Sequence, residues 1–286
     1  MKVSSAYVYT VELRFHEPFR IALGTSVVSR NVVVRLVSEE GLEGWGEGSP
    51  SRRILGETFE GAVGDACRLA SELVSMDEVD AEQLYSIGME GGYSPSAVAA
   101  VDMALLDLKG RLAGLPLYRL LGGYRGRLET DVTIGIMEPE EMAERAAKYV
   151  EAGFRILKLK LGEDPERDIE RVRLVRDAVG EGVKIRVDAN QGWTVEQAIR
   201  VIDRIASYDV ELVEQPVRWD DLAGLARVRK ESPVPIAADE SAKTPSDVVK
   251  LADHEAVDIV NIKLMKSRGI WGALKVAAVC EAHGIK

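Results

Sequence analysis

Residues 156–263 repeat one pattern, and this pattern decides the fold. Five short runs of strand-type residues each end in a charged residue: ILKLK (156–160), IRVD (185–188), LVE (212–214), IAAD (236–239) and IVNIK (259–263). The charged residues are Lys160, Asp188, Glu214, Asp239 and Lys263, at successive gaps of 28, 26, 25 and 24 residues. A strand and its following helix have about this length, so the spacing predicts consecutive β/α units. In a (β/α)8 barrel, residues at these strand ends carry the chemistry.

The same rhythm extends to both sides of the repeat. Asp131–Ile136 predicts a strand before it, and Ile285-Lys286 reads as the first step of a seventh strand. We therefore expect residues 124–286 to form a TIM-like (β/α)8-type barrel domain, with six full units and the beginning of a seventh. A closed barrel needs eight strands and typically about 250 residues. We expect the natural protein to continue for two more units.

Residues 1–123 predict a separate α+β domain, because strands come first and helices follow. Alternating residues predict strands over 3–15, 30–38 and 41–47, with a long loop at 18–29 between the first two. Helical patterns follow over 58–74, 79–88, 94–113 and 117–121.

Composition excludes several classes of protein. The chain has 286 residues and a net charge of −10 without a basic cluster, which argues against nucleic acid as a partner. Neither a signal-peptide core nor a stretch long enough to span a membrane is present. We expect a cytoplasmic protein in which Cys67 and Cys280 are reduced.

The three acids of the repeat predict a metal site. Asp188, Glu214 and Asp239 end adjacent strands, so their side chains converge above the barrel. Converging carboxylates repel one another unless a cation lies between them, and all-oxygen ligation favours Mg²⁺ or Mn²⁺ over zinc. The alternative is that each acid caps the next helix or pairs with a lysine. Three acids in a row at one period favour the metal.

The lysines predict a reaction class. Lys158 and Lys160 are two apart, so both point into the barrel, where the charge of Lys158 favours the neutral, basic form of Lys160. The alternative is an edge strand with solvated lysines. Strands two and six of an eight-stranded barrel are opposed, so we expect Lys160 and Lys263 to flank a metal-bound carboxylate substrate. One lysine would remove the proton α to that carboxylate, and the other would return one to the enediolate on the opposite face.

The sequence resembles the muconate lactonizing subgroup of the enolase superfamily, and more narrowly its dipeptide epimerases. The subgroup motifs are LKLKLG (157–162), RVDANQGW (186–193), VEQPV (213–217), ADES (238–241) and NIKLMKSRGI (261–270), and the epimerase-like strings are PFRIALGTS (18–26) and LGET (55–58). The resemblance implies a capping domain before the barrel. It implies an acid/base pair of Lys160 and Lys263. It also implies Mg²⁺ ligation by Asp188, Glu214 and Asp239, support from Lys158 and a substrate contact at Thr133.

We therefore expect a Mg²⁺-dependent racemase or epimerase acting on a small carboxylate, with a dipeptide as the expected substrate, in a homo-oligomer without nucleic acid or membrane partners. An o-succinylbenzoate synthase or muconate cycloisomerase would use the same lysines and acids. A metal-binding scaffold without turnover is a third possibility, against which the complete set of lysines and acids argues.

Two features implied by the resemblance bear on the substrate. Epimerases that prefer alanyl-glutamate carry an arginine in the first capping loop, where this chain reads Ala22-Leu23-Gly24-Thr25. Arg20 and Arg30 are the nearest candidates, although surface or strand roles suit them better. The family also uses an Asp-x-Asp pair on strand eight to hold the dipeptide ammonium, and that strand lies outside the sequence.

Overall fold

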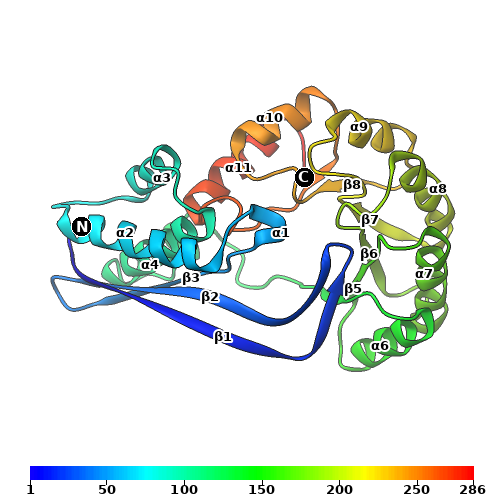
Figure 1. The fold of residues 1–286 in the computed structure, drawn as a ribbon, viewed down its shortest axis with the longest axis horizontal. Helices are drawn as coiled ribbons and strands as arrows, with labels where there is room; N and C mark the ends of the chain where they lie inside the picture. The colour runs from blue at the N-terminus through cyan, green and yellow to red at the C-terminus, as the bar shows by residue number, and fades with distance from the viewer.

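The computed structural model describes residues 1–286 in two parts, an N-terminal cap and a curved ring of parallel strands (Figure 1). The cap contains β1 (Val3–Ile21), β2 (Gly24–Ser38), β3 (Glu43–Gly48), α1 (Arg52–Leu55), α2 (Phe59–Ser75), α3 (Ala81–Glu90), α4 (Pro95–Leu112) and α5 (Leu117–Leu120). The ring contains β4 (Val132–Ile134), α6 (Pro139–Glu151), β5 (Ile156–Lys160), α7 (Pro165–Val179), β6 (Lys184–Asp188), α8 (Val195–Ile205), β7 (Val210–Glu214), α9 (Leu222–Glu231), β8 (Ile236–Ala238), α10 (Pro245–Asp253), β9 (Ile259–Val260) and α11 (Ile270–Ala282). A 3₁₀ turn (Ala206–Tyr208) follows α8.

The ring is the larger part of a TIM-like barrel. Its strands pair in chain order from β4 to β9, and every pair is parallel. Helices α6 to α10 cover the outside of the strands (Figure 1). Alternation sends Leu157 and Leu159 into a fully buried apolar core and leaves Lys158 and Lys160 on the inner side. The predicted fold class, a barrel with an α+β cap, is confirmed.

The sixth barrel strand is shorter than predicted. β9 ends at Val260, so Lys263 lies in the turn beyond it rather than at the strand's end. On the free side of β9, the Lys286 amide donates to the Asp258 carbonyl at 3.0 Å, and the Lys286 carbonyl accepts from the Val260 amide at 2.8 Å. This is the position that a seventh parallel strand takes, as the sequence predicts for Ile285-Lys286.

The core of the cap depends on glycines in β3. A Cβ added at Gly44, Gly46 or Gly48 would lie 2.0–2.2 Å from a carbonyl oxygen of α4, so only glycine permits this approach. The long helix α4 therefore lies directly on the sheet. Its alanines, together with the inward-facing valines of β2, form a second apolar core separate from that of the barrel.

The predicted loop at residues 18–29 is wrong. β1 and β2 form one long hairpin that pairs as far as Ile21 and Gly24, and its tip reaches the barrel (Figure 1). A register shift between Arg14 and Phe19 interrupts the alternation, which explains why the sequence pattern ends early there. The tip is fixed to the barrel by the Ile136 amide, which donates to the Arg20 carbonyl at 2.8 Å.

A buried carboxylate joins the cap to the barrel. Asp102 of α4 is 1% exposed, and its Oδ2 accepts a hydrogen bond of 2.6 Å from the Ile270 amide. Burial raises the pKa of Asp102 to about 7, against the influence of the Ile270 and Trp271 amides and of the Lys109 charge.

This raised pKa predicts a pH-dependent difference between the wild type and Asp102→Asn. The folded protein binds a proton at Asp102 between the ordinary carboxyl pKa and 7, whereas the unfolded chain does not, so lowering the pH stabilises the folded state. Between pH 7 and pH 5 the wild type should gain about 2 kcal/mol of unfolding free energy relative to the variant. Urea unfolding at several pH values measures the difference, and parallel stability curves would contradict it.

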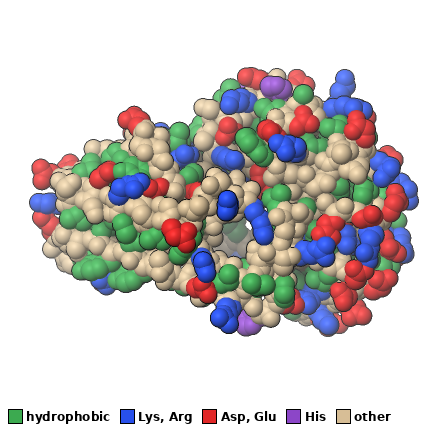
Figure 2. All heavy atoms as spheres, viewed as in Figure 1, with side chains coloured by type: hydrophobic (Ala, Val, Ile, Leu, Met, Phe, Trp, Pro, Cys, Tyr) green, Lys and Arg blue, Asp and Glu red, His purple; other side chains and the backbone are tan.

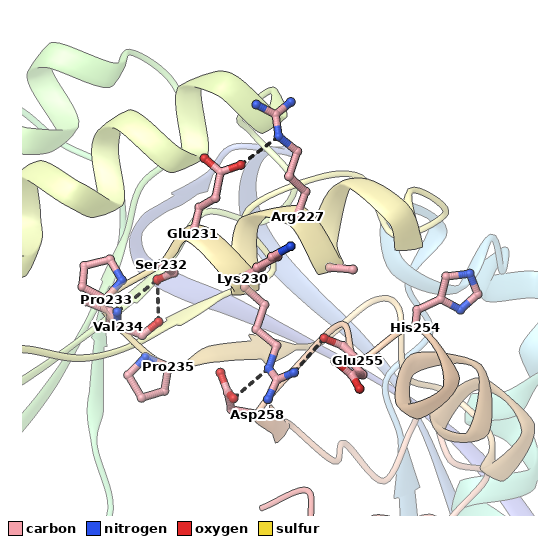
Figure 3. A pocket seen from close by; sticks show the side chains of 12 residues that line it. Arg227, Lys230, Glu231, Ser232, Pro233, Val234, Pro235, His254, Glu255 and Asp258 are labelled. Carbon is pink, nitrogen blue, oxygen red and sulfur yellow. Dashed lines mark hydrogen bonds and ion pairs between the residues drawn. The ribbon is translucent and has the colours of Figure 1, made fainter.

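The two ends of the barrel differ in their charged groups. Figure 2 shows Lys and Arg side chains around a hollow between the cap and the barrel. Another hollow lies at the amino ends of β8 and β9 (Figure 3), where Arg229 pairs with Asp258 at 2.8 Å and Arg227 with Glu231 at 3.1 Å. These charges neutralise one another, and the amino ends of barrel strands contribute to stability, whereas catalytic residues lie at the carboxyl ends. We therefore assign this second hollow no catalytic role.

None of the helices combines the length and apolar character needed to cross a membrane.

Candidate active site

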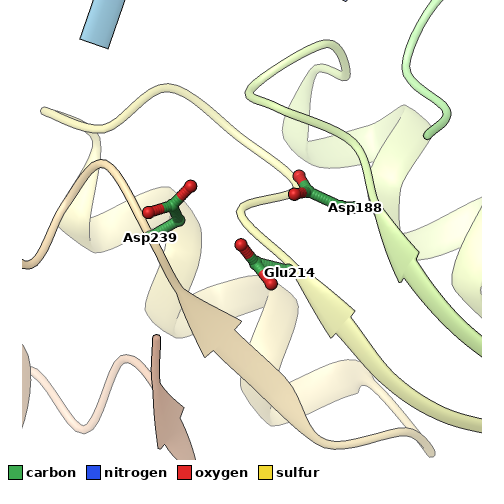
Figure 4. Close-up of side chains that lie close together, drawn as sticks. All are labelled: Asp188, Glu214 and Asp239. Carbon is green, nitrogen blue, oxygen red and sulfur yellow. The ribbon is translucent and has the colours of Figure 1, made fainter. Parts of the chain in front are cut away.

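Three carboxylates meet at the carboxyl ends of the central barrel strands. Asp188 ends β6, Glu214 ends β7, and Asp239 directly follows β8 (Figure 4). One oxygen from each lies within 4.8 Å of the others, and the three residues are 0%, 3% and 0% exposed. Neighbouring parallel strands in register produce this convergence, because Asp188 pairs with Glu214 across β6 and β7.

Strained backbone just beyond the strands orients these acids. Asn190 and Gln215 have positive φ angles of 42° and 38°, which non-glycine residues rarely adopt. The Asn190 amide donates to Asp188 Oδ1 at 2.9 Å, and Gln215 Oε1 accepts from the Asp239 amide at 2.9 Å. Gln215 therefore supports the neighbouring strand end, a role that its place in the VEQPV string does not reveal by itself.

Three predicted lysines surround the acids. Lys158 Nζ donates to Glu214 Oε2 at 2.6 Å and lies 2.9 Å from Asp188 Oδ2. Lys160 Nζ donates to Asp188 Oδ2 at 2.6 Å, and Lys263 Nζ donates to Asp239 Oδ2. Lys160 and Lys263 thus stand at opposite ends of the row of acids.

Lys160 and Thr133 have further neighbours on the inner side of the barrel. Asn190 Oδ1 accepts a hydrogen bond of 2.8 Å from Lys160 Nζ, and the side-chain Nδ2 of Asn190 donates to Glu240 Oε1 at 3.1 Å. Thr133 on β4 is level with Lys158 on β5, so alternation places both on the same face.

A fourth lysine, Lys266, was not assigned a role from the sequence. It is 0% exposed, and its Nζ donates to Asp239 Oδ1 at 2.6 Å, to the Asp239 carbonyl and to the Asn261 carbonyl at 3.0 Å. Asn261 in turn donates to Glu214 Oε1 at 2.8 Å. Lys266 therefore fixes the position of Asp239 from within the protein. The only sign of this role in the sequence is the Lys-x-x-Lys spacing from Lys263.

Replacing Lys266 by methionine should strongly destabilise the protein. The change removes the fully buried one of the two lysines that pair with the Asp239 carboxylate, and breaking a buried ion pair from one side costs about 3–5 kcal/mol. Lys250→Met is the matched control, because Lys250 lies 4.0 Å from Asp247 on the surface and such pairs contribute about 0–1 kcal/mol. Denaturant unfolding measures both variants, and equal stabilities would contradict the assigned role.

Burial and the lysine charges act against each other in this site. Burial disfavours the charge of Lys158, but Asp188 and Glu214 outweigh it and raise the Lys158 pKa above its ordinary value. Burial also favours neutral Asp188, yet Lys160 and Lys158 outweigh it and lower the Asp188 pKa. Burial and the Asp188 charge raise the pKa of Glu214 to about 7. Glu214 is thus the acid whose charge is least compensated by the protein.

The donor set suits a hard divalent cation. All three converging ligands are carboxylate oxygens, and neither histidine nor cysteine joins the cluster. Mg²⁺ and Mn²⁺ prefer such oxygen ligands and leave the remaining coordination positions to water and substrate. The residues present therefore fit the predicted metal.

The two arginines considered as substrate contacts have partners within the protein. Arg20 Nε lies 2.7 Å from Glu163, next to the barrel mouth, and Arg30 Nε donates to Glu12 at 2.9 Å within the hairpin. Gly24 has a left-handed φ of 127°, and a Cβ there would lie 2.8 Å from the guanidinium of Arg53. The hairpin tip thus has no arginine of its own directed to the mouth without a partner.

Comparisons with known proteins match the chain over nearly its whole length. The mandelate racemase / muconate lactonizing enzyme N-terminal domain matches residues 3–122, and the enolase C-terminal domain-like family matches residues 141–286. The chain is 42% identical to a hydrophobic dipeptide epimerase of Enterococcus faecalis, covering 100% of this chain and 81% of the relative. It is 40% identical to an L-Ala-D/L-Glu epimerase of Bacillus subtilis, covering 100% and 80%.

A solved structure extends the likeness to the fold. The crystal structure of the dipeptide epimerase from E. faecalis, complexed with Mg and the dipeptide L-Leu-L-Tyr, superposes with a TM-score of 0.96 at 41% identity. The match covers 100% of this chain and 81% of that chain.

Proposed function

This chain belongs to the mandelate racemase / muconate lactonizing enzyme family of the enolase superfamily, and we propose that it is a Mg²⁺-dependent dipeptide epimerase. One observation carries the proposal: Lys160 and Lys263 stand on either side of three buried, converging carboxylates. The names of the similar proteins favour a dipeptide over the substrates of o-succinylbenzoate synthase and muconate cycloisomerase.

Asp188, Glu214 and Asp239 would hold the metal. Bound Mg²⁺ would stabilise the negative charge that develops on the substrate carboxylate when its α-proton leaves. Lys158 bridges Asp188 and Glu214, and Lys266 fixes Asp239, so these two lysines keep the ligands in place. Lys160 and Lys263 also donate to acids, but they do so from the two opposite ends of the row, which makes them our candidates for proton transfer.

Lys160 and Lys263 would act as the acid/base pair. Each has a flexible side chain ending at one side of the row of acids, so a carboxylate bound there exposes its α-carbon to both amines. Removal of a proton by one lysine and delivery by the other to the opposite face inverts the configuration. Thr133, level with Lys158, is our candidate for a further substrate contact.

The residues at the barrel mouth indicate which dipeptides the protein prefers. Because Ala22–Thr25 lacks an arginine and Arg20 is paired with Glu163, the hairpin tip offers no free arginine of its own to an acidic side chain. An apolar dipeptide is therefore the first substrate to test, and an acidic one is tested beside it because Arg53 of α1 contacts the tip at Thr25. We further propose a cytoplasmic homo-oligomer that binds neither nucleic acid nor membrane, in keeping with the net charge of −10.

A panel of dipeptides tests the function. The full-length protein is incubated with Mg²⁺ and dipeptides that include L-Leu-L-Tyr and L-Ala-L-Glu, and chiral chromatography detects the epimers. We expect epimerisation of at least one dipeptide, faster for apolar ones, and its loss when EDTA removes the metal. If no dipeptide is epimerised but the substrate of o-succinylbenzoate synthase or muconate cycloisomerase is converted, the lyase or cycloisomerase alternative replaces this proposal.

A further inference from the structure

The turn that carries Lys263 is short, tight and held by its own backbone. The Lys266 amide donates to the Lys263 carbonyl at 2.9 Å, and the Gly269 amide donates to the Leu264 carbonyl at 2.8 Å. Two consecutive left-handed residues, Arg268 with φ 60° and Gly269 with φ 99°, then lead into α11. We call residues 263–269 the lysine turn. Its first residue is the proposed acid/base Lys263, and its Lys266 holds Asp239.

The lysine turn ends on a residue of the cap. Helix α11 begins after Gly269, which has no side chain to cap it. Asp102 of α4 takes that place: its Oδ2 accepts from the Ile270 amide at 2.6 Å and lies 3.4 Å from the Trp271 nitrogen. An acid at this position satisfies the free amides of a helix start and complements the helix dipole.

Contacts around Gly269 leave the turn little freedom. A Cβ at Gly269 would lie 2.3 Å from Asp102 Oδ2, so the carboxylate lies directly against the turn's backbone. A Cβ at Gly272, on the first turn of α11, would lie 2.7 Å from the ring of Tyr85 from α3. The cap therefore touches the end of the lysine turn on two sides.

The contact of Asp102 with the start of α11 has an energetic cost. Asp102 Oδ1 is buried without a hydrogen-bond partner, and an unsatisfied buried polar atom costs about 1–3 kcal/mol. An apolar residue at position 102 would be enough for the packing of α4 on the barrel. A carboxylate is needed there only for the contact with the start of α11.

We propose that Asp102 is a positioning residue through which the cap sets the place of Lys263 in the site. The proposal rests on the proposed function, because it takes Lys263 as one of two proton-transferring lysines. Lys160 stands on β5, within the continuous ladder of the barrel, and does not depend on this contact. Replacing Asp102 should therefore lower α-proton exchange more on the substrate face served by Lys263 than on the face served by Lys160.

Asp102→Ala and Asp102→Asn test this with two measurements. The first is α-deuterium exchange into each stereoisomer of the best dipeptide, measured separately at pH 8. In Asp102→Ala, the exchange that depends on Lys263, identified as the one lost in Lys263→Ala, should fall by about 10–100-fold more than the other, since misplacement by about 1 Å costs that much. Asp102→Asn retains an oxygen acceptor for the Ile270 amide and should restore most of the lost rate.

The second measurement is amide hydrogen exchange of the metal-free protein. In Asp102→Ala, the amides of Gly269, Ile270 and Trp271 should exchange faster, whereas the Ala189 amide beyond β6 should not change. Asp107→Ala is the matched control: Asp107 is also on α4 and accepts from the Trp45 amide at 2.9 Å, but that bond stays within the cap. This control variant should leave α-deuterium exchange into both stereoisomers and amide hydrogen exchange in the lysine turn unchanged.

The outcomes separate this inference from the proposed function. Equal loss of exchange on both faces in Asp102→Ala, or unchanged amide exchange in the lysine turn, would overturn the positioning role. If the wild type exchanges no α-proton, the proposed function fails, and an unchanged lysine turn in the amide measurement then overturns the positioning role as well. Asymmetric loss together with rescue by asparagine supports it.

Discussion

Alanine at Lys160 or at Lys263 should lower the rate of epimerisation by about 10²–10⁴-fold, because each variant lacks one of the two proposed acid/base groups. The two variants should differ in what remains. Each keeps one lysine, and that lysine can still remove and return a proton on its own face. Lys160→Ala should therefore retain α-proton exchange with one stereoisomer, and Lys263→Ala with the other.

Separate exchange measurements on the two stereoisomers check this expectation. Lys243→Ala is a suitable control, because Lys243 is also a cation near the barrel mouth but lies over the ring of Trp219 at 4.4 Å instead of against an acid. It should keep exchange on both faces. Full activity in both lysine variants, or loss of the same stereoisomer in both, would contradict a pair of opposed lysines.

Glutamine at Glu214 should abolish Mg²⁺ binding within the measurable range, with a loss of affinity of at least about 100-fold. Glu214 is the middle ligand of the three, and an amide oxygen carries no charge to attract the hard cation. Glutamine has nearly the same shape, so the loss reports on charge and not on packing. Titration calorimetry of the metal-free protein with MgCl₂ measures the affinity directly.

Glu211→Gln is the matched control for this change. Glu211 lies on the same strand, β7, but pairs with Arg186 and Lys184 away from the three acids. The control should bind Mg²⁺ as the wild type does. If Glu214→Gln also binds Mg²⁺ normally, the cation lies elsewhere in the protein.

The barrel and the row of acids could be predicted because local pattern decides both. In each unit an apolar run gives the strand, and the charged residue after it stands at the open end, where it cannot pack in the core. Asp188, Glu214, Asp239 and Lys160 follow from this rule. Lys263 was expected at a strand end as well, but β9 stops at Val260 and the lysine reaches the acids from the following turn.

The hairpin tip and the supporting residues could not be predicted in the same way. The register shift in β1 hides the alternation that continues to Ile21, so those residues resembled a loop. Lys266 is fully buried although its neighbours in sequence resemble those of a surface lysine. Asp102 bonds to a residue 168 positions away. Such partners are chosen by the packing of the cap on the barrel, which no short pattern records.

Proton NMR of a dipeptide in D₂O tests the central claim, that two lysines beside a metal site exchange the α-proton. Lysine amines exchange their protons with solvent, so the proton delivered to the opposite face is a solvent one. With the full-length protein and Mg²⁺, we expect the epimer to appear with deuterium at the inverted α-carbon, and neither epimer nor exchange when EDTA is present. An epimer that retains its original α-proton, or no exchange with any dipeptide, would contradict the assignment.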